Sequence, residues 1–183
     1  MSARKLLRRL LGDRRAAAAV EFAFIAPLLI GFTGAIFEVI FIAYDFSLAS
    51  EATRRGLRTA LVQDPVGALT TVNTTPVVCG KSGSAVSCSG GSPSSSSGSG
   101  FTAIYNAMKA IKTDIAQSNV QISYSTSGLD DPVTAPGIVT PLVTVKLTGL
   151  TYSFRLLTLI PGAPTSFQFP AFTSAAVGPS SVP

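Results

Sequence analysis

An uncharged apolar run from Phe22 to Phe37 constrains this chain more than any other feature. With its flanks, from Val20 to Ile42, it contains fourteen Val, Ile, Leu or Phe residues. A helix needs about 20 mostly apolar residues to cross a bilayer, and each such side chain favours insertion by roughly 0.3 to 0.6 kcal/mol at the helix centre. We therefore predict a transmembrane helix over residues 16–44.

Two carboxylates lie at the ends of this apolar segment. Glu21 is at its N-terminal mouth, and Glu38 lies about 24 Å beyond Phe22 at about 1.5 Å per residue, near the far interface of a ~30 Å hydrocarbon core. An ionisable residue inside a span is by default a hypothesis for a functional site. The alternative for Glu21 is a side chain that only reaches the inner interface or pairs with Arg14 or Arg15.

Positive charge is concentrated in a basic leader, residues 1–15, which holds six of the fourteen Lys and Arg residues. Because Lys and Arg beside a span stay in the cytoplasm, we predict one span, a cytoplasmic N-terminus and a domain outside the cytoplasm. A smaller basic group after the span, Arg54, Arg55 and Arg58, argues the other way. The leader lacks interleaved aromatic residues, so no nucleic-acid partner is expected.

A cleaved secretory signal is the alternative interpretation of the N-terminus, with a cut near Ala49. Signal peptides usually have apolar cores of about 7 to 15 residues, followed by small residues. Here the apolar run is longer and its alanines, residues 16–19, precede it. The pattern therefore favours a retained span.

The helical pattern continues over residues 45–64 and ends before Pro65. Leu48, Ala52 and Gly56 form a stripe of mostly small residues on one side of this extension. Such a stripe lets another helix approach closely, or it packs on the protein's own domain. Both interpretations stay open at this point.

Residues 65–100 are expected to form an irregular, low-complexity loop, because the tract from Gly90 to Gly100 is almost entirely Gly and Ser. Cys79 and Cys88 flank a short polar stretch within it. An even number of cysteines in an exported domain suggests one disulfide, and two free thiols are the alternative. The chain has no His and no further Cys, so no metal site is expected.

Residues 101–183 are expected to form an α+β head. Apolar residues at helical spacing predict an amphipathic helix over residues 101–118, and alternation predicts three or four antiparallel strands after it. The strand signals fall at residues 120–124, 143–147, 152–156 and 167–169. Asp130 and Asp131, adjacent acids without further ligands, are not expected to bind calcium.

No enzyme is expected. The chain lacks His for acid–base work, any Ser-, Cys- or Lys-centred catalytic motif, and a phosphate-binding loop. We therefore expect no catalytic residue, no cofactor and no small-molecule substrate.

The segment RRAAAAVEFAFIAPLL, residues 14–29, resembles the N-terminal signature of TadE-like proteins, which are pseudopilins of the Tad (Flp) pilus system. These proteins typically carry a basic leader, a short Ala-rich run, Val-Glu-Phe and a Pro a few residues later. The segments GAIFEVIF, residues 34–41, and EATRRGLRTAL, residues 51–61, also resemble the family. The resemblance covers roughly residues 8–62 and is weak over the β-rich remainder.

The resemblance implies a cut by a membrane-embedded prepilin peptidase between Ala16 and Ala17. Glu21 is then residue five of the mature chain, where its carboxylate would pair with the α-amine of a neighbouring subunit and select the assembly register. Ala16 stands where Gly is usual. Implied partners are the membrane, other pilin-like subunits and the Tad assembly platform.

The function that the resemblance implies is a minor pilin or pseudopilin in a bacterial inner membrane, with its head in the periplasm or on the pilus. The alternative is an inner-membrane-anchored periplasmic adaptor that never enters a filament. A second intramembrane acid, Glu38, has no role assigned from the sequence.

Overall fold

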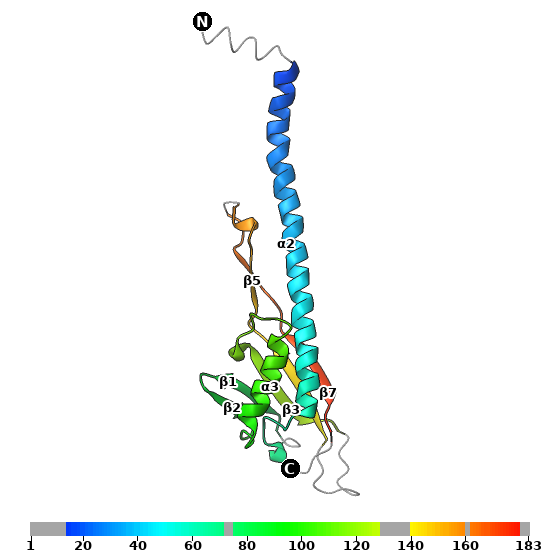
Figure 1. The fold of residues 1–183 in the computed structure, drawn as a ribbon, viewed down its shortest axis with the longest axis vertical. Coiled ribbons are helices and arrows are strands. Elements are labelled where there is room, and N and C mark those ends of the chain that lie inside the picture. Colours follow the sequence, from blue (N-terminus) through cyan, green and yellow to red (C-terminus); the bar gives the residue numbers. More distant parts are fainter. Residues whose placement is uncertain (1–13, 72–74, 129–139, 160–161, 180–183) are drawn as a thin grey trace. The chain divides into compact units, whose positions relative to one another are not determined.

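The computed structural model describes residues 14–71, 75–128, 140–159 and 162–179 of the chain (Figure 1). Most of the predicted basic leader, and the acid pair Asp130 and Asp131, lie outside these residues. The chain divides into two compact units. Unit 1 consists of residues 1–42 and 153–165, and unit 2 consists of residues 43–152 and 166–183.

Helix α2 (Arg14–Val62) contains the predicted span and its predicted helical extension. It continues through Pro27, whose missing N–H leaves one carbonyl without its usual helical donor. The helix ends just before Asp64 and Pro65, as the position of the proline predicts. The prediction of a long apolar N-terminal helix is confirmed.

Unit 2 is built on a five-stranded antiparallel sheet with the strand order β2-β1-β3-β4-β7. Its strands are β1 (Val77–Ser82), β2 (Ala85–Ser89), β3 (Val120–Thr126), β4 (Pro141–Leu147) and β7 (Phe172–Val177). Helix α3 (Ser97–Lys109) connects the hairpin β1–β2 to the central strands. Short 3-10 helices are η1 (Leu69–Thr71), η2 (Gln117–Asn119) and η3 (Leu157–Leu159).

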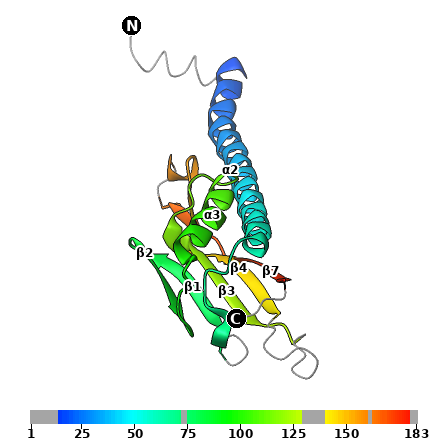
Figure 2. The same cartoon turned by 60° about the horizontal axis from the view of Figure 1, so that its bottom comes forward.

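The core of unit 2 lies between one face of this sheet and two helices, α3 and the C-terminal part of α2 (Figure 2). Alternate residues of β3 and β4 are buried on that face, as their apolar–polar alternation predicts. Gly56 of α2 marks the closest approach, because a Cβ atom there would lie 2.6 Å from Met108 Cγ of α3 and 3.4 Å from Val145 Cγ1 of β4. A side chain at position 56 would collide with this core.

The stripe of small residues on α2 therefore packs on the chain's own head unit. Ala49, Ala52 and Ala60 are at most 5% exposed, and Gly56 is buried between them. Arg54, Arg55 and Arg58 are exposed on the other side of the helix. Of the two interpretations of the stripe, packing within the same domain is the one that the structure supports.

The strands β5 (Thr151–Ser153) and β6 (Ser166–Gln168) form a separate two-stranded ribbon. Beyond β5 the chain turns through η3, in unit 1, where the N–H of Phe154 donates to the carbonyl of Thr165 at 3.0 Å. The alternation at residues 152–156 predicted a longer strand. The strand does not continue to residue 156, because the backbone N–H groups of residues 155–157 bind the side chain of Glu38 instead of a neighbouring strand.

The α+β class and the antiparallel sheet are confirmed, but the main sheet has five strands instead of three or four. The hairpin β1–β2 falls within residues 65–100, where we expected an irregular loop. The Gly and Ser residues of this hairpin have low strand propensity, so its strand signal is weak. Strand β1 pairs with β2 on one side and with the seven-residue strand β3 on the other. Strand β7, rich in Ser and Ala, was likewise not predicted.

Candidate functional site

The N-terminal turns of α2 carry the predicted processing and assembly residues. Ala16 and Ala17 both lie in the helix, and Ala17 is exposed. Glu21, one turn later, is also exposed, between Val20 at 56% and Phe22 at 71% exposure. Among the side chains that the structure describes, no ion pair reaches Glu21. Within this single chain the Glu21 carboxylate is therefore presented outward on an apolar helix surface.

The second acid of the span, Glu38, has the opposite environment, because only 1% of it is exposed. Its Oε1 atom accepts hydrogen bonds from the backbone N–H groups of Arg155 at 2.6 Å and Leu157 at 3.3 Å, and from that of Leu156 between them. Successive N–H groups at the start of a helical turn form a favourable site for an anion. Here the anion is a side chain of the same unit.

Sequence reasoning identified Glu38 but missed its partners. The donors lie 117 to 119 residues further along the chain and are backbone groups, which leave no side-chain pattern to detect. Two of the three residues that carry them, Arg155 and Leu156, were instead expected at the end of a strand. The only available signal was Gly149 and the Pro161-Gly162 pair, which bracket a reversal of the chain.

The predicted membrane-spanning part of helix α2 exposes apolar side chains over most of its surface. Among the described residues, one helix is long and apolar enough to cross a membrane, and it is this one. Only 6% of its apolar 18-residue window is buried. A core helix of a soluble protein would be covered by other elements. The helix is consistent with a single-pass membrane anchor near the N-terminus.

An apolar groove of about 700 Å³ lies along unit 1. The span contributes Pro27, Ile30 and Gly34 to its lining, and the turn after β5 contributes Leu156 and Leu157. The Thr33 hydroxyl, also at the groove, donates to the carbonyl of Leu29 at 2.8 Å, so it has a partner within the helix. The groove therefore suits a hydrocarbon group.

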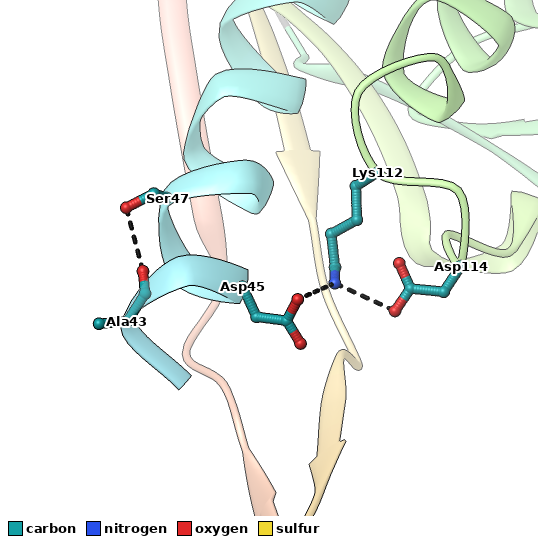
Figure 3. A network of polar contacts seen from close by, with 5 residues as sticks. All are labelled: Ala43, Asp45, Ser47, Lys112 and Asp114. Carbon is teal, nitrogen blue, oxygen red and sulfur yellow. Dashed lines mark hydrogen bonds and ion pairs between the residues drawn. The ribbon is translucent and has the colours of Figure 1, made fainter. Parts of the chain in front are cut away.

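Unit 2 contains a disulfide and a buried ion network. Cys79 and Cys88 are directly opposite each other in β1 and β2, and a disulfide with an S–S distance of 2.01 Å joins them. The Lys112 ammonium, on a side chain that is 4% exposed, lies 3.3 Å from the Asp45 carboxylate and 3.0 Å from that of Asp114 (Figure 3). This lysine ties α2 to the segment after α3.

The described part of the chain contains no group of three His, Cys, Asp or Glu residues arranged to hold a metal ion. The buried charged side chains in it, Glu38 and Lys112, both have protein partners. The two acids of the span, Glu21 and Glu38, are the candidate functional residues.

Comparison with known proteins bears on this same helix. Residues 16–58 match the model of the TadE-like protein family. The match begins at Ala16, contains both Glu21 and Glu38, and ends within the part of α2 that packs on the sheet. The resemblance of the N-terminal sequence to TadE-like proteins is confirmed over these residues. No curated protein and no solved structure matches the chain.

The TadE-like match suggests a pilin-like protein associated with a Tad pilus, a class that is generally not enzymatic. The matched residues cover the helix and leave the sheet of unit 2 outside. The family match therefore concerns the helix and not the contacts of the head.

Proposed function

We propose that this chain is a minor pilin or pseudopilin, a structural or assembly subunit of a Tad (Flp) pilus or a related secretion apparatus. The observation that carries the proposal is the exposed Glu21 on the uncovered apolar surface of a TadE-like helix. An acid in that position is less costly in lipid when another group supplies its counter-charge.

The counter-charge in this proposal is the α-amine of a neighbouring subunit. A prepilin peptidase cuts between Ala16 and Ala17, so that Ala17 becomes the first residue and Glu21 the fifth. A buried ammonium and a buried carboxylate are each costly alone, and removing one partner of such a pair costs about 3 to 5 kcal/mol. Only the register that joins the two charges avoids this cost, so Glu21 selects the assembly register.

The orientation follows from the charge of the leader. Six basic residues precede the span, so its N-terminus stays in the cytoplasm and unit 2 lies in the periplasm of a bacterial inner membrane or on the pilus. A disulfide between Cys79 and Cys88 suits an oxidising compartment. The partners are the membrane, other pilin-like subunits, the prepilin peptidase and the Tad assembly platform.

The test replaces Glu21 by Gln, which keeps the shape of the side chain and removes its charge. Pilus yield should fall sharply while the amount of protein in the membrane stays normal, because assembly and not insertion depends on the ion pair. Glu51→Gln is the matched control, since Glu51 is an exposed acid of the same helix outside the span. Normal pili from the Glu21→Gln strain would overturn the proposal.

One observation favours a second candidate, an inner-membrane-anchored adaptor that never enters a filament. Ala16 occupies the place before the cut where pilin-like proteins usually have Gly. An uncut chain keeps its basic leader and has no α-amine at Ala17 for a neighbour's Glu21 to bind. The adaptor predicts pili that are insensitive to the charge of Glu21.

A further inference from the structure

The depth of Glu38 in a membrane is fixed by the helix that carries it. About 20 residues of helix cross a 30 Å hydrocarbon core, so a span that begins near Val20 ends near Ile40. The side chains beside Glu38 fit that depth, because Phe37 is 50% exposed and Val39 is 64% exposed. Glu38 itself is 1% exposed, so it alone is withdrawn from this apolar surface.

The turn that covers Glu38 must lie at the same depth. Its three backbone N–H groups, at residues 155–157, bind the carboxylate directly. In hydrocarbon, an unsatisfied backbone group and an unpaired carboxylate are both unfavourable by several kcal/mol. The bonds between them satisfy both groups at once, so the amides of residues 155–157 do not oppose a position of this turn at the edge of the hydrocarbon core.

The outer surface of this turn is amphipathic. Leu156 is 38% exposed and lines the apolar groove together with Leu157. Gly34 leaves the helix side of the groove without a side chain, where a Cβ atom would reach ordinary van der Waals contact with Leu156, 3.8 Å from its Cδ1. Arg155, the residue before them, is exposed. The turn thus combines an apolar face with one exposed cation, as expected of a segment at a lipid interface.

We propose that the turn formed by residues 154–159 enters the bilayer leaflet that contains Glu38 and binds a phospholipid there. An acyl chain fills the apolar groove between the turn and α2, and the Arg155 guanidinium binds the phosphate of a headgroup with net negative charge. The protein is then held at two places, by the span and by this turn. The inference rests on the membrane-anchor part of the proposed function and not on pilus assembly.

The absence of tryptophan from the sequence allows a direct test with single-tryptophan variants of the full chain. Each variant is reconstituted in phosphatidylcholine vesicles with or without brominated acyl chains, which quench tryptophan only inside the bilayer. Leu156→Trp reports on the turn, and Phe24→Trp, at a position 78% exposed in the span, reports on the anchor. Val62→Trp, at a position 83% exposed in unit 2, is the control outside the bilayer.

Brominated lipid should quench the fluorescence of Leu156→Trp and Phe24→Trp and leave that of Val62→Trp unchanged, because only the first two positions lie within the hydrocarbon core. Thr158→Trp, on the exposed side of the same turn, replaces Leu156→Trp if that variant does not fold. Quenching of the turn by aqueous acrylamide and not by brominated lipid would overturn the inference while Phe24→Trp still supports the anchor. A turn shielded from both quenchers would also overturn it, because protein, such as a second copy, would then fill the groove.

The headgroup part of the inference has its own control. Brominated phosphatidylglycerol should quench Leu156→Trp at about fivefold lower content than brominated phosphatidylcholine, because one juxtamembrane arginine attracts anionic lipid by about that factor. Adding Arg155→Gln should abolish this preference, and adding Arg58→Gln, an exposed arginine of unit 2, should retain it. Equal quenching by both lipids without either substitution would refute a role of Arg155 in headgroup binding.

Discussion

The carboxylate of Glu38 accepts a hydrogen bond from the backbone N–H of Arg155, 2.6 Å away and 117 residues later in the chain. This bond gives the second acid of the span a partner inside its own unit. Glu21, the first acid, is exposed, and in the proposed function its charge is met by a neighbouring subunit. The two acids of one helix thus have different surroundings, and the hydrogen bonds of Glu38 lie within one chain.

Replacing Glu38 by Ala should release the turn at residues 154–159. Hydrogen bonds to a charged acceptor contribute about 1.5 to 3 kcal/mol, so the amides of residues 155–157 should exchange with solvent about 10- to 100-fold faster. Hydrogen-exchange mass spectrometry of the chain in nanodiscs measures this directly. Glu38→Gln, which keeps one acceptor oxygen, should give a smaller increase, and β3 should be unaffected in both variants.

Unchanged exchange at residues 155–157 in Glu38→Ala would mean that the turn is held by contacts other than the carboxylate. An equal increase in β3 would instead indicate general unfolding of the protein.

A side chain at Gly56 should destabilise unit 2. The Cβ atom would meet Met108 Cγ at 2.6 Å in a filled core, and overpacking of this kind costs about 1 to 3 kcal/mol. Gly56→Val should therefore lower the denaturation midpoint in detergent. Gly98→Val is the matched control, because Gly98 lies in α3 with open space around it, and it should leave the midpoint nearly unchanged. Equal effects of the two variants would contradict the described packing of α2 on α3.

The charges of the ion network differ in burial, because the Lys112 ammonium is buried and the carboxylates of Asp45 and Asp114 are more exposed. Asp45→Asn combined with Asp114→Asn leaves that charge buried without a counter-charge and should cost about 3 kcal/mol or more. Lys112→Met removes the charge but keeps the buried stem, and leaves two carboxylates that reach water, so its cost should stay within about 1 kcal/mol. Urea unfolding of the two variants measures the difference. A larger loss from Lys112→Met than from the double variant would contradict this account.

Burial raises the pKa of the Tyr124 hydroxyl above its ordinary value of 10.0, and the hydrogen bond from the Val66 N–H opposes this shift. Above about pH 10 the unfolded chain loses this proton while the folded chain keeps it, so the stability that Tyr124 contributes is lost as pH rises. Tyr124→Phe leaves the buried Val66 N–H without its acceptor and should cost about 1 to 3 kcal/mol at neutral pH.

The difference in free energy of unfolding between wild type and Tyr124→Phe should therefore shrink as the pH is raised from about 9 to about 11. Thermal unfolding in detergent across this range provides the measurement. A difference that stays constant or grows would mean that the phenol ionises as readily in the folded chain as in the unfolded one.

Short-range patterns carried most of what could be predicted from the sequence. The long apolar helix, helix α3 and the central strands β3 and β4 each have a pattern that one segment shows by itself, and each is present. Helix α3 spans Ser97–Lys109, whereas the sequence predicted a helix over residues 101–118. The hairpin β1–β2 was not predicted, because residues such as Gly80 and Ser87 have low strand propensity and the pairing depends on β3, far along the chain.

The candidate site was predictable in its acids and not in their surroundings. Glu21 and Glu38 stand out because charge is unexpected in an apolar helix. That one is exposed and the other enclosed depends on the turn at residues 155–157, whose backbone donors have no sequence signature. Long-range pairing of a side chain with backbone groups is the kind of contact that local patterns do not encode.

The central claim, that this chain matures and assembles like a pilin, is tested most directly by the N-terminal sequence of the protein purified from membranes. The account predicts a start at Ala17, which frees the α-amine that a neighbouring Glu21 binds. A start at Met1 would contradict it and leave an uncut membrane-anchored protein, and a start near Ser50 would mean that the apolar helix is a removed signal.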